Sequence, residues 1–462
     1  MQIPVIEIAH KLGLSTIVFD AIPSVGGASL AHKFCKVDIS DEQACVNAAL
    51  ELSRESPLHG VITVGTDFST TVARITETLG LPGHTYTAAT LAKDKFHMRR
   101  AFKAAGVPSP EYCQVETFED LKLVDFDPPW VVKPVDSMGA RGVQLVSHRE
   151  ALAPAVEEAW VHSRKKAALV EEFIPGKEFS IDALVSRGEI KIQGLADRDI
   201  WFPPRFIEMG HRFPTVLDEK QQEKLLETFK AGVRSLGLTH GAAKGDMRWH
   251  PQKGPMVGEI AGRLSGGFMS GWTYPLSSHF SSIEQAIHLA LGEEIALSES
   301  LGGDPVAERA FISAPGVIRE IQGLETLVSL PGLKHLFWQK KPGDKVNFPQ
   351  NNVEKIGNFI LCESTVEKLD RNIHQVYSQV LVRLEPKGLE TTQWFDSPEG
   401  PAAFSEGSEE DYYGLTRGEI LESFKILTGT DGRALGHKDN RFWKYLEKGG
   451  LQGLVYYWDS FS

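Results

Sequence analysis

The sequence has few of the features that mark disulfide-rich, zinc-finger or membrane proteins. Its 462 residues include only four cysteines, which are scattered and have no CxxC spacing, so neither a zinc site nor a disulfide framework is indicated. It has no run of 18 apolar residues and no signal-peptide pattern at its start, which argues against a membrane span or a secretion signal. We therefore expect a cytoplasmic protein, and its length predicts more than one domain.

Excess positive charge and a dinucleotide fingerprint are also lacking. The chain carries 49 basic and 61 acidic residues, a net charge of -12, which argues against a nucleic-acid partner. No GxGxxG motif occurs, which argues against a dehydrogenase of the Rossmann type. A phosphate ligand stays compatible with this balance, because local lysines and a metal ion can outweigh the overall field.

The first 90 residues read as an α/β domain that begins with a helix. Val5, Ile8 and Leu12 recur at helical spacing, whereas Ser15–Asp20 and Val61–Val64 read as buried strands. Parallel βαβ domains usually begin with a strand. We therefore expect the first strand to be absent or to lie upstream.

Lys133 is the most informative residue. It lies in the apolar stretch Pro129–Pro134, and burying its charge is unfavourable unless it meets an anion. The loop that follows, Asp136–Gly142, contains two glycines whose backbone N–H groups can approach phosphate oxygens. The pattern predicts a β-hairpin that closes over a nucleoside triphosphate.

Two acidic residues on successive predicted strands indicate a metal site. Asp246 lies in Ala243–Trp249 and Glu259 in Pro255–Ile260, with a turn between the strands. Two facing carboxylates repel each other unless a cation lies between them, and an oxygen-only pair favours Mg²⁺ over zinc. The alternative is a pair of acids at a strand edge.

The remaining sequence divides at changes of pattern. We expect a second domain over residues 91–300, with a small lid subdomain at about 107–173, and a strand-rich subdomain over 301–385 that contains a helix at Val366–Val382. Residues 386–462 form an acidic and aromatic tail, which we expect to pack on the body or on another subunit.

In their order along the chain, these motifs resemble the ATP-grasp superfamily over about residues 1–300. The similarity is greatest to carboxylate–amine ligases, including the L-amino-acid (dipeptide) ligases, and more distant to biotin carboxylase and carbamoyl-phosphate synthetase. The stretch Phe206–His211, followed by Pro214, is similar to a segment of those ligases. The resemblance implies an N-terminal parallel domain lacking its first strand, an α+β ATP-grasp domain whose two subdomains grip ATP, and a mixed C-terminal region.

The resemblance also implies roles for single residues. One set of residues would bind ATP, by contacting its phosphates, by forming a hinge strand around the adenine and by placing an acid on the ribose. This set is Lys95, Lys133, Ser137, Gly139, Gly142, Glu171, Glu172, Phe173, Ile174 and Glu178. The remaining roles are catalytic for Arg263, Lys133 and Arg141, metal-binding for Asp246 and Glu259, and substrate-binding for Glu208, His211 and Arg319. Some of these residues also have a purely structural interpretation. Lys95 could be a solvated lysine in the first turn of a helix, and Glu208 and His211 could belong to a structural turn.

The implied activity is an ATP-dependent ligase that joins a small carboxylate, such as an amino acid, to an amine or thiol through an acyl phosphate. It would use Mg²⁺ or Mn²⁺ and form a homodimer. The family usually has Asn two residues after the second metal acid, where this chain has Ala261, and a Glu where it has Asp246. Two alternatives remain, a bicarbonate-using carboxylase and a regulatory ATP-binding module without turnover, and Ala261 and the absent first strand support the second of them.

Overall fold

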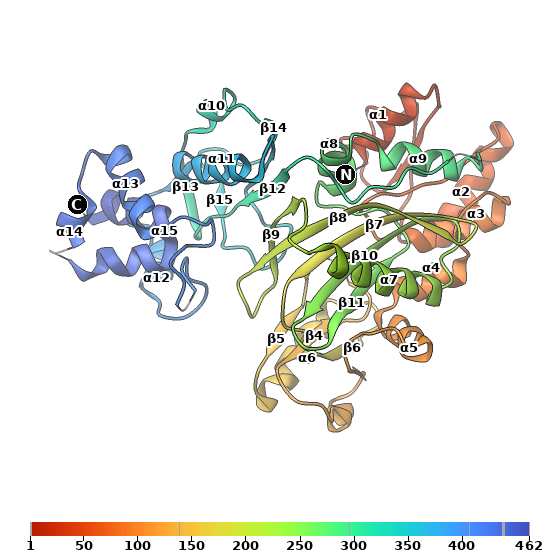
Figure 1. The fold of residues 1–462 in the computed structure, drawn as a ribbon, viewed down its shortest axis with the longest axis horizontal. Coiled ribbons are helices and arrows are strands. Elements are labelled where there is room, and N and C mark those ends of the chain that lie inside the picture. The colour runs from red at the N-terminus through yellow and green to blue at the C-terminus, as the bar shows by residue number, and fades with distance from the viewer. Residues whose placement is uncertain (1, 138, 295, 406, 437–438, 462) are drawn as a thin grey trace. The chain divides into compact units, whose positions relative to one another are not determined.

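The computed structural model describes residues 2–137, 139–294, 296–405, 407–436 and 439–461, which fold into two compact units. Unit 1 comprises the chain up to residue 138, Gly142–Arg198 and Arg212–Asp304; unit 2 comprises Gly139–Arg141, Asp199–His211 and the chain from Pro305 onward. Helices and strands mix in both units, which confirms the expected α/β class (Figure 1). None of the described helices is long and apolar enough to cross a bilayer.

The N-terminal part of unit 1 contains a short parallel sheet and several helices. β1 pairs in parallel with β2, and the connection between them contains no helix. The elements are α1 (Ile3–Lys11), β1 (Ile17–Asp20), β2 (Lys33–Lys36), α2 (Glu42–Glu55), α3 (Ser69–Leu79), α4 (Tyr86–Lys93) and α5 (Lys95–Ala105).

The strand expected at Val61–Val64 is wrong. The segment makes only an isolated bridge from Val64 to Leu264, and the Val64 carbonyl accepts a hydrogen bond from the Gln2 side chain at 2.7 Å. Because the Gly65 N–H donates to the Leu264 carbonyl, these backbone groups are satisfied by Gln2 and Leu264, and no ladder with β1 forms.

A four-stranded antiparallel sheet of order β3-β6-β4-β5 follows. Its strands are β3 (Tyr112–Val115), β4 (Trp130–Pro134), β5 (Gln144–Val146) and β6 (Ala168–Glu172), and α6 (Leu152–Val161) packs on β4 and β6. The strand, loop and strand expected around Lys133 are therefore present. Met138, in the expected phosphate loop, lies outside the described residues.

The larger sheet of unit 1 has strands in the order β11-β10-β7-β8, all antiparallel neighbours. Apolar side chains of β7, such as Phe179 and Ile181, join the core with Phe229 of α7, which lies along β10 and β11 (Figure 1). Leu184 joins a second core with α1 and α9 on the other face. The elements are β7 (Glu178–Ser186), β8 (Glu189–Trp201), α7 (Glu219–Ser235), β10 (Gly241–His250), β11 (Gly254–Ala261), α8 (Tyr274–Ser278) and α9 (Ser282–Ala290).

Unit 2 contains strands in the order β9-β12-β16-β14 and a small sheet of order β15-β13-β17. β9 (Ile207–Phe213) begins in this unit, and its other elements are β12 (Val306–Phe311), β13 (Gly316–Gln322), α10 (Leu324–Leu327), β14 (Leu333–Trp338), β15 (Lys345–Val346), β16 (Gly357–Cys362), α11 (Val366–Gln379) and β17 (Leu381–Leu384). The helix expected at Val366–Val382 therefore ends early. The apolar run beyond Gln379 pairs with β13 instead, because a short apolar run of this kind suits a buried strand as well as a helix.

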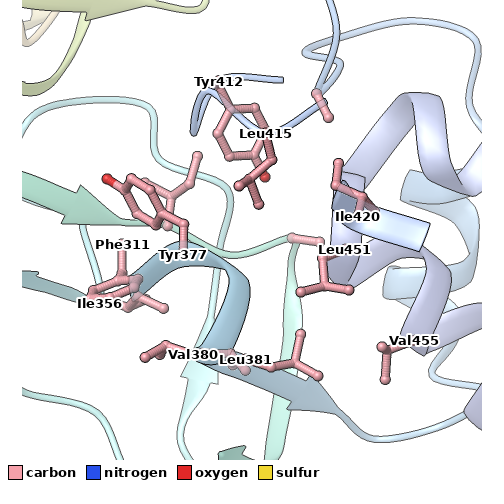
Figure 2. Packing of buried hydrophobic residues seen from close by; sticks show 14 of the residues in the cluster. Phe311, Ile356, Tyr377, Val380, Leu381, Tyr412, Leu415, Ile420, Leu451 and Val455 are labelled. Carbon is pink, nitrogen blue, oxygen red and sulfur yellow. The ribbon is translucent and has the colours of Figure 1, made fainter. Parts of the chain in front are cut away.

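The C-terminal segment is helical and shares the core of unit 2. It contains α12 (Leu389–Asp396), α13 (Arg417–Thr428), α14 (Gly432–Gly436) and α15 (Asn440–Phe461), which is kinked at Gly450. Figure 2 shows Tyr412, Ile420 and Leu451 from this segment packed with Phe311 and Tyr377 from the preceding part. The segment therefore belongs to the same folded body as β12, β16 and α11.

Candidate functional site

The two predicted metal acids face each other on neighbouring strands of unit 1. Asp246 on β10 pairs directly with Glu259 on β11. A β-bulge follows: Met247 pairs with Val257, which leaves Gly258 without a partner on β10. The turn that the sequence predicts between these strands therefore brings the two carboxylates onto one face.

Further charged residues share that face because paired residues in an antiparallel sheet point the same way. Across β10, Ser180 of β7 pairs with Asp246, and Asp182 pairs with Lys244. Residues that pair in register form three rows, which are Arg198–Glu178–Arg248, Ser180–Asp246–Glu259 and Asp182–Lys244–Ala261.

Asp246 is held between two cations. Lys244 donates to its Oδ2, and Arg198 Nη1 lies 2.9 Å from its Oδ1. The same Arg198 nitrogen lies 3.3 Å from Glu178, which also pairs with Arg248. The predicted ribose acid and the predicted metal acid are therefore linked through Arg198.

Glu259 lies in a strongly positive surrounding. Its Oε2 is 3.4 Å from the Lys95 ammonium. Burial alone would raise the pKa of Glu259, but the charges of Lys95, Lys133, Lys244 and Arg263 outweigh it and lower the pKa to about 2. Glu259 is thus an anion at any physiological pH.

Lys133 belongs to a buried triad with Glu171 and Arg99. Glu171 accepts from Arg99 Nε at 2.7 Å through one oxygen and lies 2.6 Å from Lys133 Nζ through the other. Burial lowers the pKa of Lys133 and the neighbouring Arg99 and Lys95 lower it further, whereas Glu171 opposes this. Burial raises the pKa of Glu171, but Arg99 and Lys133 outweigh it, so that pKa lies below its ordinary value.

Sequence reasoning missed Arg99 and Arg198. Arg99 is fully buried on the face of α5 that also carries Lys95, Met98 and Phe102, so its place at i+4 from Lys95 was an available signal. Arg198 lies in β8, a long strand that the sequence analysis did not anticipate. The sequence around Arg198 does not indicate a place in the site unless its pairing partner Glu178 is known.

Arg263 follows β11 and lies next to a fixed turn. Its Nη1 donates to the Leu264 carbonyl at 3.2 Å, and its buried Nε has no hydrogen-bond partner among the described residues. Asp182, fully buried on β7, accepts from the Ser265 backbone N–H at 3.0 Å and from the Ser265 hydroxyl at 2.7 Å. Asp182 thereby holds the backbone two residues beyond Arg263.

The predicted adenine hinge is a continuous strand and turn with several groups already bonded. The Glu172 N–H donates to the Glu111 carbonyl at 2.9 Å, and the Ile174 carbonyl accepts from Arg248 at 2.5 Å. The Arg248 guanidinium lies 5.1 Å from the centre of the Phe173 ring. At Gly176, a Cβ would lie 2.1 Å from the Trp249 carbonyl, so the turn into β7 requires glycine.

Near the expected phosphate loop, Lys95 Nζ donates to the Ser137 carbonyl at 3.0 Å. Gly142 lies in unit 1, where a Cβ on it would meet the His162 ring at 2.8 Å. Gly139 and Arg141 belong to unit 2, and the Gly139 carbonyl accepts from the Asn352 N–H at 3.3 Å there.

The three predicted substrate residues all lie in unit 2. The Glu208 N–H donates to the Asn352 side chain at 2.8 Å, and the fully buried His211 has its Nδ1 3.3 Å from Glu308. Arg319 Nη2 lies 3.0 Å from Asp459, which also pairs with Arg383. The structure therefore gives His211 and Arg319 definite acidic partners.

The acid pair suits a hard divalent cation that also binds phosphate. No group of three or more His, Cys, Asp or Glu in the described part of the chain could hold a metal by itself. Mg²⁺ is commonly held by one or two carboxylates together with substrate phosphates and water. Asp246 and Glu259 fit that donor set, and Lys95 and Lys133 fit the phosphates.

Three stretches of the chain match known domain families. Residues 6–83 match the ATP-grasp N-terminal domain, 92–267 the ATP-grasp domain, and 309–385 the L-amino acid ligase C-terminal domain 2. The protein y4rH of Sinorhizobium fredii is 24% identical over 391 residues, covering 82% of this chain and 80% of its own. Alanine–anticapsin ligase of Bacillus subtilis is 28% identical over 223 residues, covering 43% of this chain and 47% of its own.

A solved structure shows the same fold over most of the chain. The L-amino acid ligase of Bacillus licheniformis superposes with a TM-score of 0.73 at 22% identity, covering 82% of this chain and 95% of that one. The chain spans about half the length of the alanine–anticapsin ligase that it matches. The chain therefore contains matches to an ATP-grasp N-terminal domain over residues 6–83 and to an ATP-grasp domain over residues 92–267.

Proposed function

We propose that this protein is an ATP-dependent ligase that joins a small carboxylate, such as an amino acid, to an amine through an acyl phosphate. The observation that carries the proposal is the acid pair Asp246–Glu259, with Lys95 beside Glu259 and two further cations on Asp246. An amino-acid substrate is supported by the match of residues 309–385 to the L-amino acid ligase domain and by the alanine–anticapsin ligase relative.

The reaction has two balanced steps. A substrate carboxylate oxygen attacks the γ-phosphorus of ATP, the bond to the β–γ bridging oxygen breaks, and ADP leaves with the bonding electrons. The amine nitrogen then attacks the acyl carbon, inorganic phosphate leaves, and the amine loses a proton to solvent. Phosphoryl transfer needs positioning and charge neutralisation more than covalent help.

In this proposal the cations of unit 1 hold the triphosphate. Lys95 and Lys133 bind phosphate oxygens, and Arg263 faces the transferring phosphoryl group and later the oxyanion. Asp246 and Glu259 would hold Mg²⁺ or Mn²⁺, which would neutralise the phosphate oxygens. Glu178 would bind the ribose of the nucleotide, and the hinge Glu172–Ile174 would bind its adenine base.

The remaining assigned positions are part of the same proposal. Within unit 1, the backbone N–H group of Gly142 would contact the terminal phosphates. Glu208 and His211 would contact the substrate. Arg319 would bind a substrate carboxylate only through the nitrogens that it does not share with Asp459.

The test is ADP release by the full chain with Mg·ATP and pairs drawn from a panel of amino acids, with mass detection of the product. We expect ADP and a condensed product in equal amounts for at least one pair. ADP release with bicarbonate alone would favour carboxylation instead. ATP binding by calorimetry with no ADP from any acid would favour a regulatory module.

A further inference from the structure

Lys244 occupies a distinctive place in the acid-pair site. It lies two residues before Asp246 on β10, so both side chains leave the same face of the sheet. Its ammonium group donates to Asp246 Oδ2, and its side chain is only 13% exposed. An ammonium ion is therefore fixed against one of the two carboxylates that fit a divalent cation.

The residue opposite Lys244 supplies no ligand. Lys244 pairs in register with Ala261 of β11, in the row next to Asp246 and Glu259. A methyl group cannot bind a cation, and no group of three metal-binding side chains occurs in the described residues. Two divalent ions that share a triphosphate generally need bridging carboxylates and further oxygen ligands. The protein oxygens here suffice for one ion.

The charge balance leads to the same result. Besides Lys244, Asp246 meets Arg198 at 2.9 Å, and Glu259 meets Lys95 at 3.4 Å. Each carboxylate is thus already partly neutralised by a fixed cation. A second divalent ion would add two positive charges close to these cations, and Asp182, the acid that pairs in register with Lys244, already accepts hydrogen bonds from the backbone N–H and the hydroxyl of Ser265.

We propose that this site binds one divalent cation with the triphosphate, and that the Lys244 ammonium provides the second positive charge at Asp246. This inference rests on the proposed function, because it assumes that a nucleoside triphosphate binds over the acid pair. It assigns Lys244 a positioning role: the ammonium fixes Asp246 Oδ2, while Glu259 and Oδ1, which Arg198 also contacts, are the oxygens that would meet the metal.

The experiment counts Mn²⁺ per bound nucleotide by electron paramagnetic resonance on the full chain, with the β,γ-imido analogue of ATP as the probe. We expect one Mn²⁺ per bound nucleotide in the wild type and no spin coupling between Mn²⁺ ions. The double variant Lys244→Gln, Ala261→Asn removes the ammonium and adds an oxygen ligand in the same row. We expect it to bind a second, spin-coupled Mn²⁺.

Two single variants serve as controls. Ala261→Asn alone retains Lys244 and should stay at one Mn²⁺ per nucleotide. Lys191→Gln removes a lysine of β8 whose partner is the surface residue Glu189, and it should also stay at one.

The possible results separate the inference from the proposed function. Two Mn²⁺ ions in the wild type or in Ala261→Asn would overturn the inference while leaving nucleotide binding intact. A double variant that binds nucleotide with a single Mn²⁺ would overturn the role of Lys244. If the wild type binds no nucleotide in the parallel calorimetric titration, the proposed function fails and the inference fails with it.

Discussion

Replacing Glu171 by Gln should strongly destabilise unit 1. Glu171 is the only carboxylate in the described contacts of Arg99 and Lys133, whose side chains are 1% and 12% exposed. Removing one partner of a buried ion pair leaves an uncompensated charge and costs about 3–5 kcal/mol of unfolding free energy. Arg99 keeps its hydrogen bond to the Gly258 carbonyl at 2.5 Å. The loss of unfolding free energy is therefore roughly that caused by one unpaired charge.

Thermal unfolding followed by circular dichroism would measure this loss. At about 2–4 °C per kcal/mol for domains of this size, a loss of about 3–5 kcal/mol lowers the melting temperature by roughly 6–20 °C. The matched control is Glu172→Gln, the next residue along β6, which pairs with the half-exposed Lys253. An exposed pair of that kind is worth about 0–1 kcal/mol.

A double variant and the pH dependence sharpen the test. Adding Lys133→Met to Glu171→Gln removes one of the two orphaned cations, so the two changes should be less destabilising together than the sum of the single changes. Because the pKa of Glu171 is lowered in the fold, its stabilising effect is present above its unfolded pKa and is lost as pH falls through the folded value. Equal melting temperatures for Glu171→Gln and Glu172→Gln would refute the reasoning.

Three further predictions concern the charges of unit 1. Lys133→Met should lower ADP formation at least about 100-fold by removing a phosphate contact, whereas Lys103→Met, at an exposed position of α5, should leave the rate unchanged. Burial raises the pKa of Asp182 to about 7 despite its bonds from Ser265, so the contribution of Asp182 to stability in urea should fall as pH rises from about 4 to 7; Asp182→Asn should lack that fall. Burial lowers the pKa of His84 to about 4, so its contribution should grow as pH rises from about 4 to 6.5, and His84→Gln should lack that rise in the same urea series.

The parts of the fold that sequence reasoning predicted are those fixed by short-range signals. The turn expected between β10 and β11 is present at His250–Gly254, so Asp246 and Glu259 lie on neighbouring strands as expected. Local signals of this kind do not depend on distant partners.

The parts that sequence reasoning missed depend on partners far away in the chain. The segment at Val61–Val64 is apolar enough for a strand, but it bonds to Gln2 and to Leu264 instead of joining a ladder. Arg99 would read as a solvated helix residue until Glu171, far along the sequence, is placed beside it. A buried charge is recognisable only together with the group that neutralises it.

The bulge at Gly258 connects the two halves of the site. Val257 and Ile260 both reach the core under α7, although they are three residues apart on one strand. Strict alternation would put them on opposite faces, and the extra residue Gly258 corrects this while turning Glu259 toward Asp246. The Gly258 carbonyl accepts a hydrogen bond from Arg99, which also holds Glu171 and through it Lys133. Arg99 therefore links the position of Lys133, the proposed phosphate-binding lysine, to the bulge that orients Glu259, the proposed metal ligand. Considering each strand separately could not have shown that link.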